Sequence, residues 1–313
     1  MSSAVTPPRH PVATVGPDAY ARWRATALGA VTEAREHRLV SDLVGDVAGK
    51  QVLDIGCGDG LLICALAARG AGAVGTDLDA RMLAAARNRA SRADVPARFV
   101  QGRIERLPFP DAAFDVVVAV TVFCFVTDRT AALTEAVRVL RPGGRLVLGE
   151  LGRWSVWAAV RRVRGWLGSP TWKTARFSTA ADLSLLARSA GISVDMVRGA
   201  VYYPPVGWLA RVFAPVDRWL GPRTTLGASF IVLAGTKIGV RYVETPQGGH
   251  QTTDAEAVPG RRSPISDRRL DRASSSATRT LTICGARSGA RVSTSARVTM
   301  ARFLIRQCPE GTA

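Results

Sequence analysis

The feature that most constrains this chain is a loop with glycine at every second position, set between a strand-like run and a helical pattern. Residues 51–55 read QVLDI, an apolar run typical of a buried strand, and Gly56, Gly58 and Gly60 follow it. Glycine lacks a Cβ atom, so it adopts backbone angles that other residues avoid and lets a ligand approach the main chain. The helix predicted over 61–69 presents free N–H groups at its start. This order of strand, loop and helix predicts an α/β fold with a ligand site at the loop.

The glycine spacing argues against one common ligand, and a nearby carboxylate favours another. A dinucleotide-binding loop has the pattern G-x-G-x-x-G, whereas the sixth position here is Leu61. Asp77 ends the next predicted strand, and a right-handed crossover places it beside the glycine loop. A carboxylate there accepts hydrogen bonds from the hydroxyls of a ribose. Asp79 is the expected N-cap of the following helix.

Short β-branched runs alternate with Ala-rich helical segments over residues 18–150, which is typical of a parallel sheet with helices. The run FDVVVAV at 114–120 is apolar on both faces, as a central parallel strand should be. Further strands are predicted at 73–76, 98–101, 145–150, 192–197 and 229–234, and helices at 80–91, 128–140 and 180–190.

Composition limits the class of protein. The chain has 313 residues, of which 47% are hydrophobic, enough to bury a sizeable core. Its longest apolar stretch, 114–126, is shorter than the roughly 18–20 residues that cross a bilayer. No secretory signal is visible at the start, and the five cysteines form no CxxC pair. We therefore expect a cytoplasmic protein with reduced thiols.

The net charge of +17 is spread unevenly. Residues 240–313 carry twelve arginines against six acidic residues, are rich in Ser and Thr, and show no sustained period. Such a composition predicts a disordered tail, and its charge permits a nucleic-acid or anionic-membrane partner. Four prolines predict a flexible leader over 1–17. The α/β domain is then expected over 18–239.

Four segments in this order and spacing resemble class I S-adenosylmethionine-dependent methyltransferases. They are VLDIGCGDG at 52–60, VGTDLDARML at 74–83, LPFPDAAFDVVVAV at 107–120 and RVLRPGGRLVLGE at 138–150. The type 11 group, which includes ubiquinone and menaquinone biosynthesis methyltransferases, is the most similar branch. The resemblance extends over about 18–238. It implies a Rossmann-like, doubly wound, seven-stranded, mostly parallel sheet, with a helical insertion after the fifth strand at about 151–178.

The resemblance also implies roles for the residues of the glycine loop. Gly56, Gly58 and Gly60 would form the turn beneath the methionine part of S-adenosylmethionine, with Cys57 inside that turn. Asp54 would order the loop or meet the amino group of the cofactor.

The resemblance implies that residues after the next two strands bind the nucleoside part of the cofactor. Asp77 would hold the ribose, and Leu78 would pack on the adenine. The family reads the adenine edge with a G-D-A tripeptide that aligns with 102–104, where this chain has Arg103 in place of the acid. A guanidinium has no acceptor, so the usual contact to the adenine amino group cannot form, although the backbone N–H of Ile104 remains. We therefore expect cofactor binding to be weakened or rearranged.

Methyl transfer from a sulfonium is an in-line displacement with an activated leaving group, so positioning supplies much of the rate. The three histidines form no metal-binding cluster, and His37 is expected at the surface. Glu150, at the end of the fifth predicted strand, is a candidate general base, with pairing to an arginine as the alternative.

The segment after the fourth strand indicates the acceptor. Val120 and Thr121 would line the cofactor near its sulfonium, and Phe125 would face the acceptor. The run TVFCF at 121–125 lacks the Asn/Asp-Pro-Pro-aromatic motif of methyltransferases that act on nucleic-acid bases or amides. We therefore expect a small apolar or aromatic acceptor and no nucleic acid.

Two aromatic groups leave alternatives open. Trp154 and Trp157 have helical spacing within the basic insertion, which suits a lid over the substrate, packing on the sheet, or contact with an anionic bilayer. Tyr20 and Trp23 either close over the cofactor or pack in the core.

These observations predict a methyltransferase that uses S-adenosylmethionine on a small acceptor. The first alternative is a nucleotide-binding oxidoreductase of related fold, which Leu61 disfavours. The second is a nucleic-acid-binding protein that uses the basic tail, and no aromatic stacking platform accompanies the tail's arginines.

Overall fold

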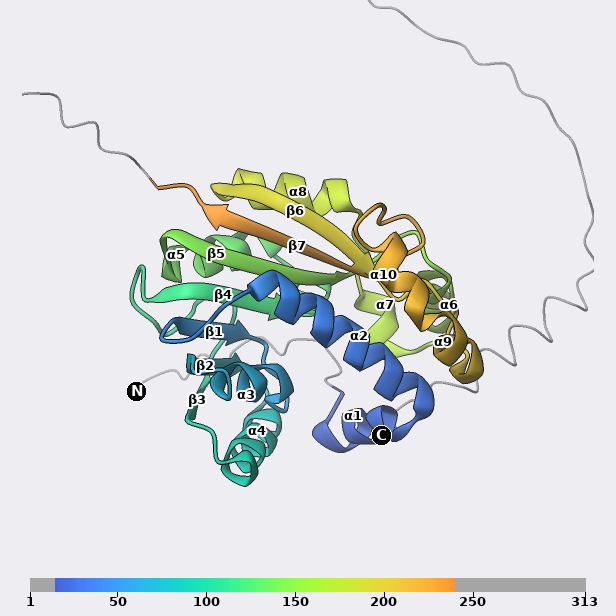
Figure 1. Cartoon of the computed structure of the whole chain (residues 1–313), viewed down its shortest axis with the longest axis horizontal. Helices are drawn as coiled ribbons and strands as arrows, with labels where there is room; N and C mark the ends of the chain where they lie inside the picture. The colour runs from blue at the N-terminus through green and yellow to red at the C-terminus, as the bar shows by residue number, and fades with distance from the viewer. Residues whose placement is uncertain (1–14, 240–313) are drawn as a thin grey trace, which may run out of the picture. The chain divides into compact units, whose positions relative to one another are not determined.

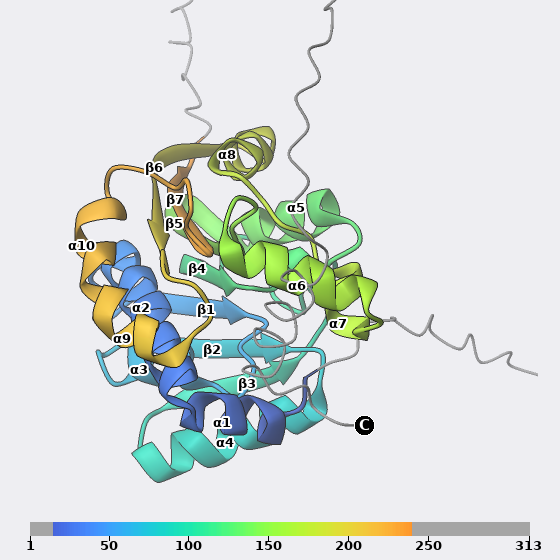
Figure 2. The same ribbon diagram turned by 90° about the vertical axis from the view of Figure 1, so that its right-hand side faces the viewer.

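The computed structural model describes residues 15–239 and shows one seven-stranded sheet with helices on both faces (Figures 1 and 2). The strand order is β3-β2-β1-β4-β5-β7-β6. Only β7 runs antiparallel to its neighbours, β5 and β6. The Rossmann-like, mostly parallel sheet expected from the sequence is thereby confirmed. The predicted tail, and the predicted leader up to residue 14, lie outside the described residues.

The first five strands lie where apolar and β-branched runs predict them. They are β1 (Gln51–Ile55), β2 (Gly72–Asp77), β3 (Ala97–Gln101), β4 (Phe114–Val120) and β5 (Leu140–Leu151). The last two are β6 (Ile192–Ala200) and β7 (Phe230–Lys237), both longer at their carboxyl ends than predicted.

Alternate side chains of the central strands enter two separate cores. On β1, Val52 packs into the core covered by α2 (Ala27–Val44), α3 (Leu61–Ala67) and α4 (Ala80–Ala93), whereas Leu53 and Ile55 enter the opposite core. That second core is closed by α5 (Arg129–Val139) and α8 (Ala180–Ser189). Burial on both faces explains why these strands read as near-continuous apolar runs.

Helix ends follow local chemistry. Asp79 caps α4 by accepting a hydrogen bond from Arg81 N, and Thr179 with Asp182 forms the predicted capping box of α8. Helix α5 ends at Val139, and Leu140 already belongs to β5, so the Pro-Gly-Gly sequence lies within the irregular start of that strand and does not itself end the helix.

Two groups of helices lie on the side of the molecule where the parallel strands end (Figure 2). The first is α1 (Pro17–Ala25), with α6 (Val156–Trp166) and α7 (Pro170–Thr174) from the expected insertion. The second fills the connection between β6 and β7, which contains α9 (Gly207–Phe213), a 3₁₀ turn η2 (Ala214–Val216) and α10 (Asp217–Leu220). Within the described residues, no helix is long and apolar enough to cross a membrane.

The strand order reverses between β1 and β4, because β2 and β3 follow on one side of β1 and β4 and β5 on the other. In open α/β sheets, such a reversal leaves a crevice beyond the carboxyl ends of the strands. The glycine loop follows β1 at this point.

Candidate cofactor-binding site

Three glycines of the loop after β1 adopt left-handed backbone angles. The φ values are +69° at Gly56, +53° at Gly58 and +79° at Gly60. A Cβ atom on Gly56 would lie 2.2 Å from Val122 Cγ2, and one on Gly60 would lie 2.8 Å from Ala86 Cβ. Glycine is thus required at 56 and 60 by both conformation and space.

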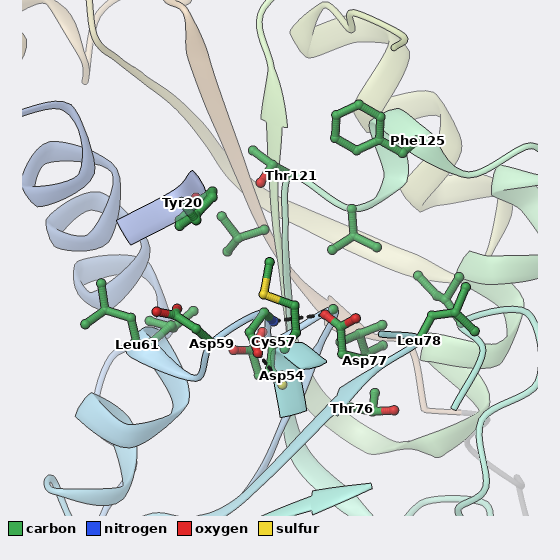
Figure 3. A pocket seen from close by; sticks show the side chains of 18 of the residues that line it. Tyr20, Asp54, Cys57, Asp59, Leu61, Thr76, Asp77, Leu78, Thr121 and Phe125 are labelled. Carbon is green, nitrogen blue, oxygen red and sulfur yellow. Dashed lines mark hydrogen bonds between the residues drawn. The ribbon is translucent and has the colours of Figure 1, made fainter. Parts of the chain in front are cut away.

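Backbone and side-chain groups of β2 hold this loop. The carbonyl oxygen of Thr76 accepts hydrogen bonds from the N–H groups of Gly56 at 2.7 Å and Cys57 at 2.9 Å. The Asp77 carboxylate accepts a bond from Gly58 N at 3.0 Å and another from Asp79 N at 2.9 Å (Figure 3). The predicted ribose-binding carboxylate is therefore fixed at the edge of the glycine loop.

Asp54 lies beneath the loop and is 3% exposed. Burial, together with the nearby charge of Asp77, raises the pKa of Asp54 to about 8. Burial also raises the pKa of Asp77, while the backbone N–H groups of Asp79 and Gly58 oppose that shift. Burial therefore favours the protonated form of the Asp54 carboxyl group.

An ion-pair cluster that the sequence did not predict joins α1 to the glycine loop. The Arg24 guanidinium donates to both carboxylate oxygens of Asp59, one contact being 2.7 Å, and to Glu33 at 2.5 Å. Arg89 of α4 donates to Asp59 at 2.5 Å. Although burial opposes ionisation of Asp59, these hydrogen bonds hold its pKa below the usual range.

A cavity of about 300 Å³ opens above the loop and is lined by α1, α2 and the ends of β1, β2 and β4. In Figure 3, Tyr20 and Phe125 lie across the cavity from Asp54 and Asp77. Twelve residues singled out from the sequence line it, and they are Tyr20, Asp54, Gly56, Cys57, Gly58, Asp77, Leu78, Arg103, Ile104, Val120, Thr121 and Phe125.

Thr121 has an unusual backbone for a β-branched residue, with φ at +52°. Its N–H donates to Gly149 O at 2.7 Å, which holds the chain in this conformation as β4 ends. Strained backbone of this kind clusters at functional sites, where the surrounding structure compensates for its cost.

Five other predicted residues do not line the cavity: Gly60, Trp23, Glu150, Trp154 and Trp157. Trp157 is 3% exposed and donates its indole N–H to Tyr203 O at 2.8 Å, so it packs within the protein. Trp154 precedes α6 and is 62% exposed. Glu150 is buried with one carboxylate oxygen 3.7 Å from Arg129 Nη2, which matches the pairing alternative.

Helix α2 contributes side chains that the sequence did not point to. Glu33, His37 and Val40 recur at helical spacing and line the cavity from α2. The expectation of a surface position for His37 is wrong, because this face of α2 turns toward the cavity, and burial lowers the pKa of the imidazole. The way α2 packs on the sheet decides which of its faces turns toward the cavity. The sequence around His37 alone therefore could not predict this position.

Position 103 carries an arginine where an acid was expected, but the nearby Glu105 has a carboxylate. Glu105 lines the cavity, and its Oε2 lies 3.6 Å from Arg103 Nε. Gly102 N donates to Asp77 O at 3.1 Å, so this segment is joined to the end of β2 where the ribose is expected. The cavity thus keeps a carboxylate at the expected adenine end.

The residues present fit S-adenosylmethionine. Gly58 has open space where a Cβ atom would stand, so a ligand can approach its backbone closely. Asp77 lines the cavity where the sequence places the ribose, and the apolar side chains of Leu78 and Ile104 offer walls for a flat base. No cluster of His, Cys, Asp or Glu suited to a metal ion occurs among residues 15–239.

The fold and this loop define a class of α/β proteins that bind a nucleoside-containing cofactor at the sheet's reversal point. Residues 53–148 match a family described as "Methyltransferase domain". A ubiquinone biosynthesis O-methyltransferase from Idiomarina loihiensis is 32% identical over 167 residues, covering 51% of this chain and 69% of that protein. A demethylmenaquinone methyltransferase from Tropheryma whipplei is 39% identical over 124 residues, covering 39% of this chain and 51% of that one.

A solved structure of a methyltransferase is also similar to this chain. A methyltransferase from Thermotoga maritima, described as S-adenosylmethionine-dependent and a possible histamine N-methyltransferase, superimposes with a TM-score of 0.54 at 26% identity, covering 70% of this chain and 95% of that one. The chain belongs to the family of S-adenosylmethionine-dependent methyltransferases. It spans about half the length of the demethylmenaquinone methyltransferases that it matches.

Proposed function

We propose that this protein transfers a methyl group from S-adenosylmethionine to a small apolar or aromatic acceptor by in-line displacement. The observation that carries the proposal is the apolar part of the cavity lining. Its apolar side chains come from α2, α3 and the segment after β4, and they are Val40, Leu62, Val122, Phe125 and Val126. Such a lining suits an acceptor with an apolar body.

The cofactor, when bound, supplies a methyl group on a sulfonium that is already an activated leaving group. The protein's part is to hold and shield the reactants. Asp77 and the glycine loop fix the cofactor end of the cavity, while Tyr20 of α1 and Phe125 face it from the other side (Figure 3).

His37 gives the apolar cavity one neutral base. Burial lowers its pKa from the ordinary value near 6.5, so the imidazole is uncharged at neutral pH. An uncharged imidazole accepts a proton, as methylation of a hydroxyl requires. This supports an acceptor with an ionisable hydroxyl on an apolar frame.

The names of the relatives support the same class of acceptor. Demethylmenaquinone methyltransferase and ubiquinone biosynthesis O-methyltransferase both refer to quinone compounds. Quinol-type rings are therefore the first acceptors to test in this protein.

The test measures S-adenosylhomocysteine formed with a demethylmenaquinol analogue and with histamine as a polar amine. We expect turnover with the quinol analogue and none above background with histamine. Turnover of histamine alone would contradict an apolar acceptor, and no acceptor-dependent product with a broad panel of ring compounds would overturn the proposal.

The same assay is run on two matched variants. Asp77→Ala removes a carboxylate that accepts two hydrogen bonds, and we expect it to raise the Kd of S-adenosylhomocysteine by about tenfold to a hundredfold. Asp79→Ala removes the α4 N-cap and the ion pair with the exposed Arg81, at a cost of about 1 kcal/mol in stability, and should leave the Kd unchanged. Equal Kd values for both variants would remove Asp77 from the cofactor site.

A further inference from the structure

The connection between β6 and β7 presents a concentration of exposed apolar side chains. On α9, Trp208 and Val212 are 66% and 62% exposed and lie one helical turn apart, with Phe213 beside them. Trp219 of α10 is 61% exposed, and Leu226 of the following loop 71%. We call these five residues the α9–α10 surface. Monomeric proteins normally leave such large apolar side chains scattered singly.

This surface is held in place from its buried side. Asp217 is 8% exposed, and its carboxylate accepts hydrogen bonds from Val201 N at 2.9 Å and Tyr202 N at 3.2 Å. Ala210 and Ala214 are buried in the core that also holds Leu28 of α2. The Asp217 carboxylate and the two alanines therefore point inward, while the five large apolar side chains of the α9–α10 surface are exposed.

The exposed charge of the segment is entirely positive. Arg211, Arg218 and Arg223 are exposed, whereas Asp217, the single acid between residues 201 and 229, is buried. The Arg223 guanidinium lies 5.1 Å from the ring centroid of Trp219. Tryptophan with arginine, free of exposed acids, matches the chemistry of an anionic lipid surface, where indoles sit at the headgroup level and cations meet phosphates.

The position of the segment relates it to the cavity. Helix α9 packs on α2, the helix whose Glu33, His37 and Val40 line the cavity. Figure 1 shows α9 and α10 at the same end of the sheet as α1 and α6, and in Figure 2 they lie beside α2, across the strand ends from α6. A bilayer against the α9–α10 surface would therefore lie close to the elements that enclose the cavity.

We propose that the α9–α10 surface docks this protein on an anionic lipid bilayer. The aromatic and aliphatic side chains enter the headgroup region, and the three arginines contact lipid phosphates. Docking of this kind is peripheral, because the apolar segment lies on the membrane and does not cross it.

The experiment uses the full chain and vesicles of phosphatidylcholine with roughly 30% phosphatidylglycerol, in about 0.15 M salt. Binding is measured by co-sedimentation, and insertion by quenching of tryptophan fluorescence with brominated lipids. The variant Trp208→Ala/Trp219→Ala tests the surface. The matched control is Leu185→Ala, an exposed apolar residue of α8 that lies away from α9 in both views (Figures 1 and 2).

We expect the double variant to reduce the vesicle partition coefficient by about tenfold and to lose most of the quenching, since each indole removed takes apolar area out of the membrane. Leu185→Ala should bind as the wild type does. Substituting Arg211, Arg218 and Arg223 by Gln should reduce the preference for anionic over neutral vesicles. Because the basic residues 240–313 are present in every variant, their contribution to binding cancels in the comparison.

Two results would overturn the proposal. The first is equal binding and quenching for the wild type and the double variant, both with unchanged thermal stability. The second is no vesicle binding by the wild type together with a concentration-dependent dimer that the double variant loses, which would assign the surface to self-association. Neither result depends on methyl transfer, so failure of the docking proposal is distinguishable from failure of the proposed function.

Discussion

The raised pKa of Asp54 predicts that cofactor binding depends on pH. The carboxyl group is buried under the glycine loop, and its pKa of about 8 keeps it neutral at pH 7. S-adenosylmethionine brings a sulfonium and an ammonium group, and a positive charge near a carboxyl lowers its pKa. We expect cofactor binding to release this proton, so the Kd should fall as pH rises from about 6 to 8.

Calorimetric titration at pH 7 in two buffers of different ionisation enthalpy measures the released proton directly. Asp54→Asn cannot release it, so the buffer dependence should shrink in that variant. The cofactor's own amino group titrates equally in both proteins and cancels. An identical buffer dependence in the two would show that Asp54 does not change its protonation on binding.

A second prediction concerns Glu105 at the expected adenine end of the site. Glu105 lines the cavity beside Arg103, the position where the family carries an acid. If Glu105 supplies the missing carboxylate, Glu105→Ala should raise the Kd of S-adenosylhomocysteine by about tenfold. Restoring an acid with Arg103→Asp in the Glu105→Ala background should recover most of that loss. A rescue that fails, or a Glu105→Ala variant that binds normally, would assign Glu105 to the surface pair alone.

Helix α1 is attached to the cofactor loop by a charge cluster. Arg24 bonds Asp59 of the loop and Glu33 of α2, so one guanidinium joins three elements. Arg24→Met leaves the partly buried Asp59 with Arg89 alone, and we expect a loss of about 1–3 kcal/mol in stability together with weaker cofactor binding. Limited proteolysis within α1, with and without S-adenosylhomocysteine, reports whether the helix detaches.

Arg22→Met is the matched control for this helix, since Arg22 is exposed one residue before Trp23. It removes the same charge and should change neither protease sensitivity nor the Kd. If both variants change protease sensitivity and the Kd equally, the effect comes from the charge of α1 and not from the contact between Arg24 and Asp59.

Elements differed in how well the sequence predicted them, for physical reasons. The sequence predicted strands β1, β2 and β4, because strands buried on both faces are continuous apolar runs along the chain. It also predicted helix α4, whose N-cap residue can be recognised in the sequence. Helices α9 and α10 were missed because they are short, interrupted by the turn η2 and stabilised by contacts with distant residues such as the buried Asp217.

The same distinction holds within the site. Asp77 and the glycines were predicted because their spacing along the chain carries the signal. His37, Arg24 and Glu105 reach the cavity through packing of helices and loops on the sheet, which no local pattern encodes.

For the molecule as a whole, buried carboxyl groups set the dependence of stability on pH. Burial raises the pKa of Asp54 to about 8 and that of Glu150 to about 7, the latter opposed by Arg129. Desolvation also raises the pKa of Glu36, a partly exposed residue of α2, to about 7, opposed by Arg161. In the unfolded chain these groups titrate near pH 4, so between about pH 4 and 8 the folded state holds protons that the unfolded state has released. These three groups therefore make the folded state less stable as pH rises through this range.

His37 acts in the opposite sense, because its lowered pKa makes the folded state bind fewer protons than the unfolded state below about pH 6.5. Above about pH 6.5 His37 no longer opposes the carboxyl groups. We therefore expect the Tm of the full chain, measured by calorimetry, to fall by several degrees as pH rises from 6.5 to 8.5. Asp54→Asn and Glu150→Gln should each flatten the slope, whereas Asp111→Asn, at an exposed ion pair with Arg138, should leave it intact. A Tm that rises with pH across this window would mean that the buried carboxyls are already ionised in the folded protein.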